Sequence, residues 1–314
     1  MSEERVQKVL AGMGFGSRRE IERWMEQGRI KINGKPCEPG DKVKSGDWVH
    51  VNGKRIIVRL EQQEPTRVIM YHKPVGQVCT RKDPEGRPTV FEHLPKSGRS
   101  RWISVGRLDI NTSGLILFTN NGELANRLMH PSNEVEREYV VRVKGEVSKD
   151  ILRQLTREVM LDDGPAHFDD IVDGGGEGQN HWYYVVIREG RKREVRRLWE
   201  HFGLQVSRLM RVRYGNIILP KSLRKGRSKD LEPADVEQLF ESVKLEYDSE
   251  KEAGLKRKSS TKKRRTVKSA KGMTQTSSLY KGKTSKQRGP KKKTSKKVGK
   301  RVSKRPASGR TRTS

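Results

Sequence analysis

The charge of this chain is concentrated at one end, which limits how much of the chain can fold. Residues 251–314 contain 25 Lys and Arg residues but a single acidic residue, Glu252, and they contain neither Trp nor Phe. Such a segment cannot bury enough apolar surface to offset the entropy lost on ordering. We therefore expect residues 246–314 to form a disordered Lys/Arg-rich tail. Residues 1–250 then carry only +6 of the total charge of +30 and are long enough for two domains.

The composition of the tail indicates two alternative roles. A polycation of this kind binds phosphate backbones by releasing counterions, and such contacts carry little sequence information. A charged tail can also serve solubility alone, so the charge by itself leaves both roles open.

Cysteine and histidine usage favours a cytoplasmic protein without a metal site. Cys37 and Cys79 are far apart, and the seven His residues are scattered, so we expect neither a disulfide framework nor a zinc cluster. The polar segment Met1–Arg5 lacks the apolar core of a signal peptide, and no apolar run approaches the ~20 residues needed to span a bilayer. We also expect a monomer, because no heptad pattern is present.

Residues 1–62 are predicted to form a small α+β domain. Apolar side chains recur at helical spacing over residues 6–13. Ser17, with Glu20 three positions later, is a capping box that begins a second helix. The pairs Asn33–Gly34 and Asn52–Gly53 then stand between short extended runs and predict tight hairpins.

Basic residues gather on the second helix and the first hairpin of this unit. They are Arg18, Arg19, Arg23, Arg29, Lys31 and Lys35. Glu22 and Glu26 lie on the same helix, so a solvated helix face is an alternative explanation. The order helix–helix–hairpin resembles an S4-type RNA-binding domain, and this resemblance implies that the basic residues bind RNA.

Residues 66–245 are predicted to form a second, larger domain. Strand-like runs and amphipathic helices alternate without a regular βαβ order, which favours an α+β fold with a mixed, largely antiparallel sheet. The predicted strands are Arg67–Tyr71, Leu115–Thr119, Tyr139–Val143, Trp182–Ile187 and Val206–Val212. The predicted helices cover residues 122–130, 150–157, 193–202 and 233–244, and Asn120 is expected to cap the first of them.

Asp109 is the first candidate for chemistry. It precedes a run of turn-forming residues, 111–114, and the apolar strand 115–118 follows at once. A carboxylate on a loop that is anchored by a buried strand is well placed to act as a nucleophile or base. The alternative from spacing alone is an Asx-turn residue that caps its own loop.

The segments Gly106–Asp109 and Thr112–Leu115 resemble the signature of the pseudouridine synthases that modify ribosomal RNA. This resemblance implies that Asp109 is the catalytic aspartate and that Arg107 helps to displace the target base. It also maps the family's tyrosine onto Tyr139 and its basic helix residue onto Arg196. Tyr139 would stack on the uracil, and Arg196 would form an ion pair with Asp109.

The resemblance extends from residue 3 to 245 and implies cofactor-free isomerisation of a specific uridine. Three stretches, 79–91, 120–131 and 190–199, are similar to family members that act on large-subunit (23S) rRNA. The absence of a P-loop and of a dinucleotide fingerprint agrees with chemistry that needs no cofactor. Two alternatives stay open: modification of small-subunit rRNA or of another site, and a non-catalytic rRNA-binding factor for ribosome assembly.

Overall fold

The computed structural model describes residues 3–60, 64–98, 100–177 and 180–247. The predicted disordered tail, 246–314, lies outside the described residues except for its first two positions. Within the described ranges, none of the helices has the length and apolar character required to cross a membrane.

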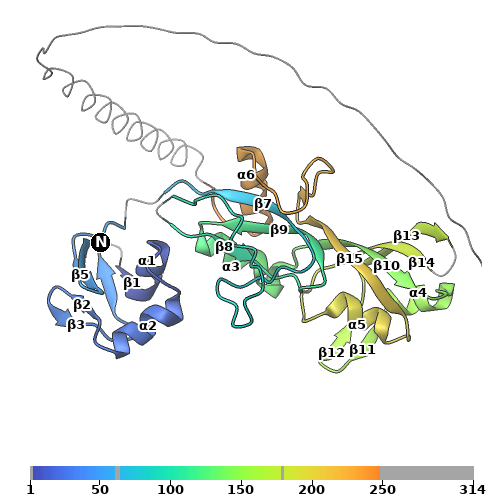
Figure 1. The fold of residues 1–314 in the computed structure, drawn as a ribbon, viewed down its shortest axis with the longest axis horizontal. Coiled ribbons are helices and arrows are strands. Elements are labelled where there is room, and N and C mark those ends of the chain that lie inside the picture. Colours follow the sequence, from blue (N-terminus) through green and yellow to red (C-terminus); the bar gives the residue numbers. More distant parts are fainter. Residues whose placement is uncertain (1–2, 61–63, 99, 178–179, 248–314) are drawn as a thin grey trace, which may run out of the picture. The chain divides into compact units, whose positions relative to one another are not determined.

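The N-terminal unit contains two helices and two small sheets, drawn in blue in Figure 1. Its helices are α1 (Val6–Gly12) and α2 (Arg18–Glu26). Four strands pair in the order β3–β2–β5–β6, and β1 pairs with β4. The strands are β1 (Glu3–Arg5), β2 (Ile30–Ile32), β3 (Lys35–Pro36), β4 (Lys42–Lys44), β5 (Trp48–Val51) and β6 (Lys54–Ile57).

Local signals in the sequence account for this unit. The backbone N–H of Glu20 donates to the Ser17 hydroxyl at 3.1 Å, and the Ser17 N–H donates to the Glu20 carboxylate at 3.2 Å. The predicted capping box is therefore confirmed. Asn33 and Gly34 have positive φ angles of 49° and 89°, as a type I′ turn between β2 and β3 requires.

The larger unit is organised around one nine-stranded sheet. Seven strands follow the order β13–β14–β10–β15–β9–β7–β17, β8 pairs with β9, and β16 pairs with β15. The strands are β7 (Val68–Lys73), β8 (Ile103–Val105), β9 (Ser113–Thr119), β10 (Arg137–Lys144), β13 (Asp170–Glu177), β14 (Asn180–Ile187), β15 (Gln205–Tyr214), β16 (Ile217–Ile218) and β17 (Ser228–Asp230). A separate hairpin pairs β11 (Val159–Leu161) with β12 (Gly164–Ala166).

One pairing in this sheet has an unusual direction. Every pairing between named strands of the described residues is antiparallel except that of β9 with β15, which is parallel. The parallel register comprises Ser113 with Met210 and Gly114 with Arg211. The prediction of a mixed, largely antiparallel sheet is confirmed, and the short parallel pairing joins the two halves of the sheet.

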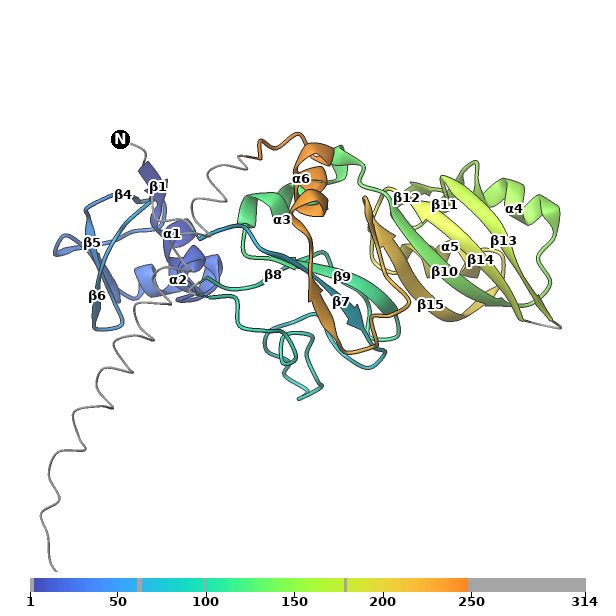
Figure 2. The same cartoon turned by 90° about the horizontal axis from the view of Figure 1, so that it is seen from above.

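A different pair of helices accompanies each half of the sheet (Figures 1 and 2). In Figure 2, α3 (Gly122–Met129) and α6 (Pro233–Ser242) accompany β7, β8 and β9. Helices α4 (Lys149–Leu155) and α5 (Glu194–Glu200) accompany β10 and β13–β15. Alternate residues of β9 enter two separate cores, so both faces of this strand are buried. A central strand buried on both faces fixes the end of the loop that precedes it.

The predicted cap of the helix at 122 was wrong by one residue. The side chain of Asn121, not Asn120, accepts the N–H groups of Glu123 and Leu124 at 3.0 and 3.1 Å. Asn120 instead accepts the N–H of Arg67 at 2.8 Å. Its side chain therefore fixes the chain where β7 begins, a long-range role that local spacing cannot indicate.

Candidate active site

Asp109 lies on the loop between β8 and β9 and is half-buried. Its backbone carbonyl accepts the N–H of Thr112 at 3.0 Å, which closes a turn. Its carboxylate has no hydrogen bond or ion pair with any described residue. The Asx turn that was the alternative for this residue is therefore not formed here, and the carboxylate oxygens are available to a ligand.

Lys73, the last residue of β7, holds this loop from below the surface. Its side chain is completely buried. The ammonium Nζ donates to the backbone carbonyls of Asp109 at 3.0 Å and Thr112 at 2.8 Å. A third bond, at 3.1 Å, goes to the carbonyl of Pro74. These bonds to a positive charge fix the backbone on both sides of the turn.

Two buried arginines hold the end of the loop and the start of β9. Arg196 on α5 donates from Nη2 to the carbonyl of Asn111 at 3.0 Å, and Arg211 on β15 donates from Nε to the carbonyl of Leu115 at 2.8 Å. Both arginines are less than a tenth exposed. We call Lys73, Arg196 and Arg211 the loop clamp. It joins three buried positive charges to the backbone of the loop and of the first residues of β9.

Burial changes the pKa of Lys73. It lowers the pKa of Lys73 from 10.5 to about 8, against an opposing effect of Cys79 and Asp109. Because this pKa is lower in the folded than in the unfolded chain, the unfolded chain binds more protons between these two values. The contribution of Lys73 to the free energy of unfolding therefore rises with pH in this window.

The depressed pKa of Lys73 should be visible in the pH dependence of stability. Between pH 7.5 and pH 10, the free energy of unfolding of the wild type should rise relative to that of Lys73→Met by about 2 kcal/mol. Urea unfolding at several pH values measures this difference. Lys149→Met, at an exposed position of α4, is the matched control and should show no such trend. If the difference in free energy of unfolding between wild type and Lys73→Met did not change with pH, the lowered pKa of Lys73 would be contradicted.

Tyr139 and Arg196 both lie at the margin of the core, each 7% exposed. Besides its bond to the loop, Arg196 donates from Nη1 to the carbonyl of Val206 at 2.9 Å. Burial lowers the pKa of Arg196, as does the charge of Arg193, whereas the charge of Asp109 opposes the shift. The expected ion pair between Arg196 and Asp109 is not among the contacts within 4.0 Å in the described residues. Arg196 supports the backbone of the loop and acts on the carboxylate through its charge.

Arg107 is exposed, although the residue after it is buried. The backbone carbonyl and N–H of Leu108 contact the Cys79 sulfur at 3.3 and 3.4 Å. Leu108 therefore anchors this end of the loop, while Arg107 remains accessible to solvent. This arrangement fits a residue that contacts RNA.

The basic residues of the N-terminal unit are on its surface. Arg18, Arg19 and Arg23 on α2 are exposed, as are Lys31 on β2 and Lys35 on β3. None of these five has an ion-pair partner among the residues that the structure describes. Arg29, also exposed, stacks on Trp24 with its guanidinium carbon 5.2 Å from the ring centroid. The unit therefore presents unneutralised positive charge to solvent.

Lys73 and Arg211 were not predicted from the sequence. Lys73 is a single charge at the end of an apolar run, directly before Pro74, and this combination is a weak signal for a buried lysine. Arg211 stands in a strand in which charged and apolar residues alternate, so its burial has no local signature. Only the pairing of β15 with β9 and β10 reveals its position.

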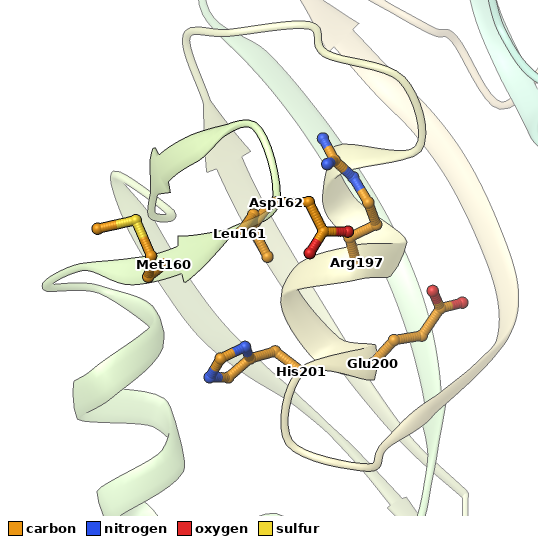
Figure 3. Close-up of a pocket in the computed structure, with 6 residues that line it drawn as sticks. All are labelled: Met160, Leu161, Asp162, Arg197, Glu200 and His201. Atoms are coloured by element: carbon orange, nitrogen blue, oxygen red, sulfur yellow. The ribbon is translucent and has the colours of Figure 1, made fainter.

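A surface hollow of about 230 Å³ lies elsewhere, between β11 and α5 (Figure 3). It is lined by Met160, Leu161, Asp162, Arg197, Glu200 and His201. None of the predicted site residues lines it. No group of three or more potential metal-binding side chains occurs within the described residues.

The fold agrees with comparisons to known proteins. Residues 67–201 match the model of the RNA pseudouridylate synthase family, and residues 4–49 match the S4 domain. A crystal structure of a pseudouridylate synthase shares the fold, with a TM-score of 0.53, 24% identity, and coverage of 75% of this chain and 99% of that chain.

This chain belongs to the RNA pseudouridine synthase family and has an S4 domain before its catalytic domain. It is 57% identical over 244 residues to ribosomal large subunit pseudouridine synthase B of Escherichia coli K12, covering 77% of this chain and 84% of the relative. It is 54% identical to the enzyme of the same name from Yersinia pestis, covering 78% of each chain. The Pseudomonas aeruginosa relative is also 54% identical, but this chain spans only 63% of its length. The predicted family, fold class and enzyme class are confirmed.

Proposed function

We propose that this chain converts a specific uridine of large-subunit ribosomal RNA to pseudouridine. The observation that carries the proposal is an unpaired, half-buried carboxylate, Asp109, on a loop whose backbone is held by three buried cations. The names of the relatives at 54–57% identity support the choice of large-subunit rRNA.

The reaction rearranges bonds within one nucleotide. The N1–C1′ bond breaks, the uracil turns, and C5 bonds to C1′; a proton leaves C5 and a proton is taken up at N1. No redox step or energy source is required, so a carboxylate and a proton-transfer group suffice. The target base must first leave its stack, which costs a few kcal/mol.

Each predicted site residue has a role in this scheme. Asp109 either attacks C1′ or abstracts a sugar proton, and the reaction balances by either route. Tyr139 stacks on the uracil and takes part in the proton step. Arg196 holds the loop through the carbonyl of Asn111 and places a positive charge near Asp109. Arg107, exposed beside the loop, helps to displace the base.

The parts of the chain outside the catalytic domain would bind the RNA. We propose that 1–62 is the RNA-binding domain, 66–245 the catalytic domain and 246–314 a basic tail that contacts RNA. The exposed cations of α2, β2 and β3 contact phosphates without reading sequence. In this scheme the protein acts as a cytoplasmic monomer on large-subunit rRNA or its assembly precursor, without a cofactor.

The tail should add affinity that depends strongly on salt. Truncation after Glu250 removes a segment with 25 Lys and Arg residues. We expect weaker RNA binding and a smaller slope of log affinity against log salt concentration, because fewer counterions are released. Filter binding from low to high salt measures the slope. An unchanged slope would mean that the tail does not touch RNA in the complex.

Tritium release distinguishes the proposed function from its alternatives. Large- and small-subunit rRNA transcripts labelled with tritium at C5 of uridine are incubated with the full chain. Release from the large-subunit transcript alone supports the proposal, whereas release from the small-subunit transcript assigns a different substrate. Tight binding of both without release would identify a non-catalytic assembly factor. Mapping of modified uridines in a strain that lacks the protein then locates the target.

A further inference from the structure

Arg211 lies where the catalytic loop and the predicted tyrosine meet. On β15 it is paired in register with Tyr139 of β10 on one side and with Gly114 of β9 on the other. Only 2% of the residue is exposed. The parallel pairing of β9 with β15 therefore places a buried cation directly beside the strand that begins at the loop.

The contacts of Arg211 are incomplete. Nε donates to the carbonyl of Leu115 at 2.8 Å. The guanidinium carbon lies 6.0 Å from the ring centroid of Tyr139 and 5.0 Å from that of Tyr214, within range of cation–π attraction. Nη2 is buried and has no hydrogen-bond partner, and no carboxylate of the described residues lies within 4.0 Å of the guanidinium.

A buried hydrogen-bond donor without an acceptor destabilises the folded state, and a buried charge without a counter-charge destabilises it more. Arg191, by contrast, forms ion pairs with Asp163, Glu189 and Glu194 and also donates to the carbonyls of Gly164 and Pro165. Two other unpartnered buried atoms belong to the same neighbourhood: Thr112 Oγ1 on the loop and Arg196 Nε on the loop clamp. Three of the seven buried side-chain atoms without a hydrogen-bond partner in the described residues therefore belong to the Asp109 loop or its clamp, and the others are on Gln7, His72, Arg197 and Trp199.

We propose that Nη2 of Arg211 binds an acceptor oxygen of the target uridylate, while the guanidinium keeps the Tyr139 ring in place. The acceptor is either a uracil carbonyl or a phosphate oxygen, since both offer a lone pair to a cationic donor. This inference rests on the proposed function and adds a substrate contact to it. Arg211 thereby links binding of the target uridylate to the position of the Asp109 loop.

The test combines variants of Arg211 with modified substrates. Arg211→Gln and Arg211→Lys are compared with the wild type and with Arg208→Gln, an exposed arginine of the same strand. Single-turnover tritium release is measured on RNA that carries uridine, 2-thiouridine, 4-thiouridine or a methylphosphonate at the target. Thermal melting of each variant shows whether it is folded. If Arg211→Gln does not fold, Arg211→Lys, which keeps the buried charge, is used for the comparison.

We expect Arg211→Gln to lower kcat/KM on the order of 10- to 100-fold, and Arg208→Gln to act at close to the wild-type rate. One of the three modified substrates should react more slowly than the uridine substrate with the wild type. The same modification should cause no further loss of rate in the Arg211 variants, because the contact of Arg211 with the substrate is already absent. That substrate identifies the acceptor as O2, O4 or phosphate. If every substrate change costs the same in the wild type and in the variants, Arg211 has no substrate contact and the inference is overturned. Absence of release by the wild type on any rRNA would instead refute the proposed function.

Discussion

Asp109→Asn should lose nearly all pseudouridine formation, by about 10⁴-fold or more. The substitution keeps the size of the side chain but removes its charge and its ability to act as nucleophile or base. The carboxylate has no partner among the described residues, so the loss cannot come from a broken side-chain contact. Carbodiimide adduct formation followed by primer extension on large-subunit rRNA measures the product.

Asp150→Asn is the matched control, since Asp150 is a 78% exposed carboxylate on α4 and pairs only with Arg153 among the described residues. It should retain full activity. Thermal melting of both variants shows whether the fold is kept. Pseudouridine at the wild-type level in Asp109→Asn would remove Asp109 from the mechanism, whatever the other site residues do.

Gly114→Ala, at the start of β9, should cause a large loss of stability although it adds only one methyl group. Gly114 has a φ of +107°, and an added Cβ would lie 2.2 Å from the carbonyl oxygen and 2.6 Å from the nitrogen of Arg211. Both atoms belong to the backbone of β15 and cannot rotate away. We expect the free energy of unfolding to fall by about 4 kcal/mol or more, as judged by urea unfolding.

Gly106→Ala, in the loop before β9, separates the effect of the steric clash from that of the backbone strain. Gly106 also has a positive φ, +77°, but a Cβ added there would have nothing within 4 Å. It should therefore cost only the backbone strain, about 1 to 2 kcal/mol. Equal effects of the two substitutions would show that strands β9 and β15 are not in close contact at Gly114.

Much of the fold was predictable because its signals are local. The capping box at Ser17, the Asn33–Gly34 turn and the alternating pattern of Tyr139–Val143 each specify structure within a few residues. The loop at Asp109 was predictable for the same reason, since its turn-forming residues precede a fully buried strand. The roles of the site residues stay predictions until the variants are measured.

Long-range features were not accessible to the same reasoning. Asn120 and Asn121 are both good capping residues, and only the contact with Arg67 decides between them. Arg211 reaches the loop through a bond that spans 96 residues of sequence. Nothing in the composition of either strand indicates that β9 and β15 pair in parallel.

The loop clamp also determines when, during synthesis, the Asp109 loop can reach its final structure. Its three cations come from positions 73, 196 and 211, on both sides of the loop that they hold. A chain emerging from the ribosome exposes Asp109 long before Arg196 and Arg211 have been added, and domains fold as units during synthesis. The nascent chain therefore lacks a complete loop clamp until almost the whole catalytic domain has emerged. RNA bound early by the N-terminal domain would meet an active centre only on a nearly finished molecule.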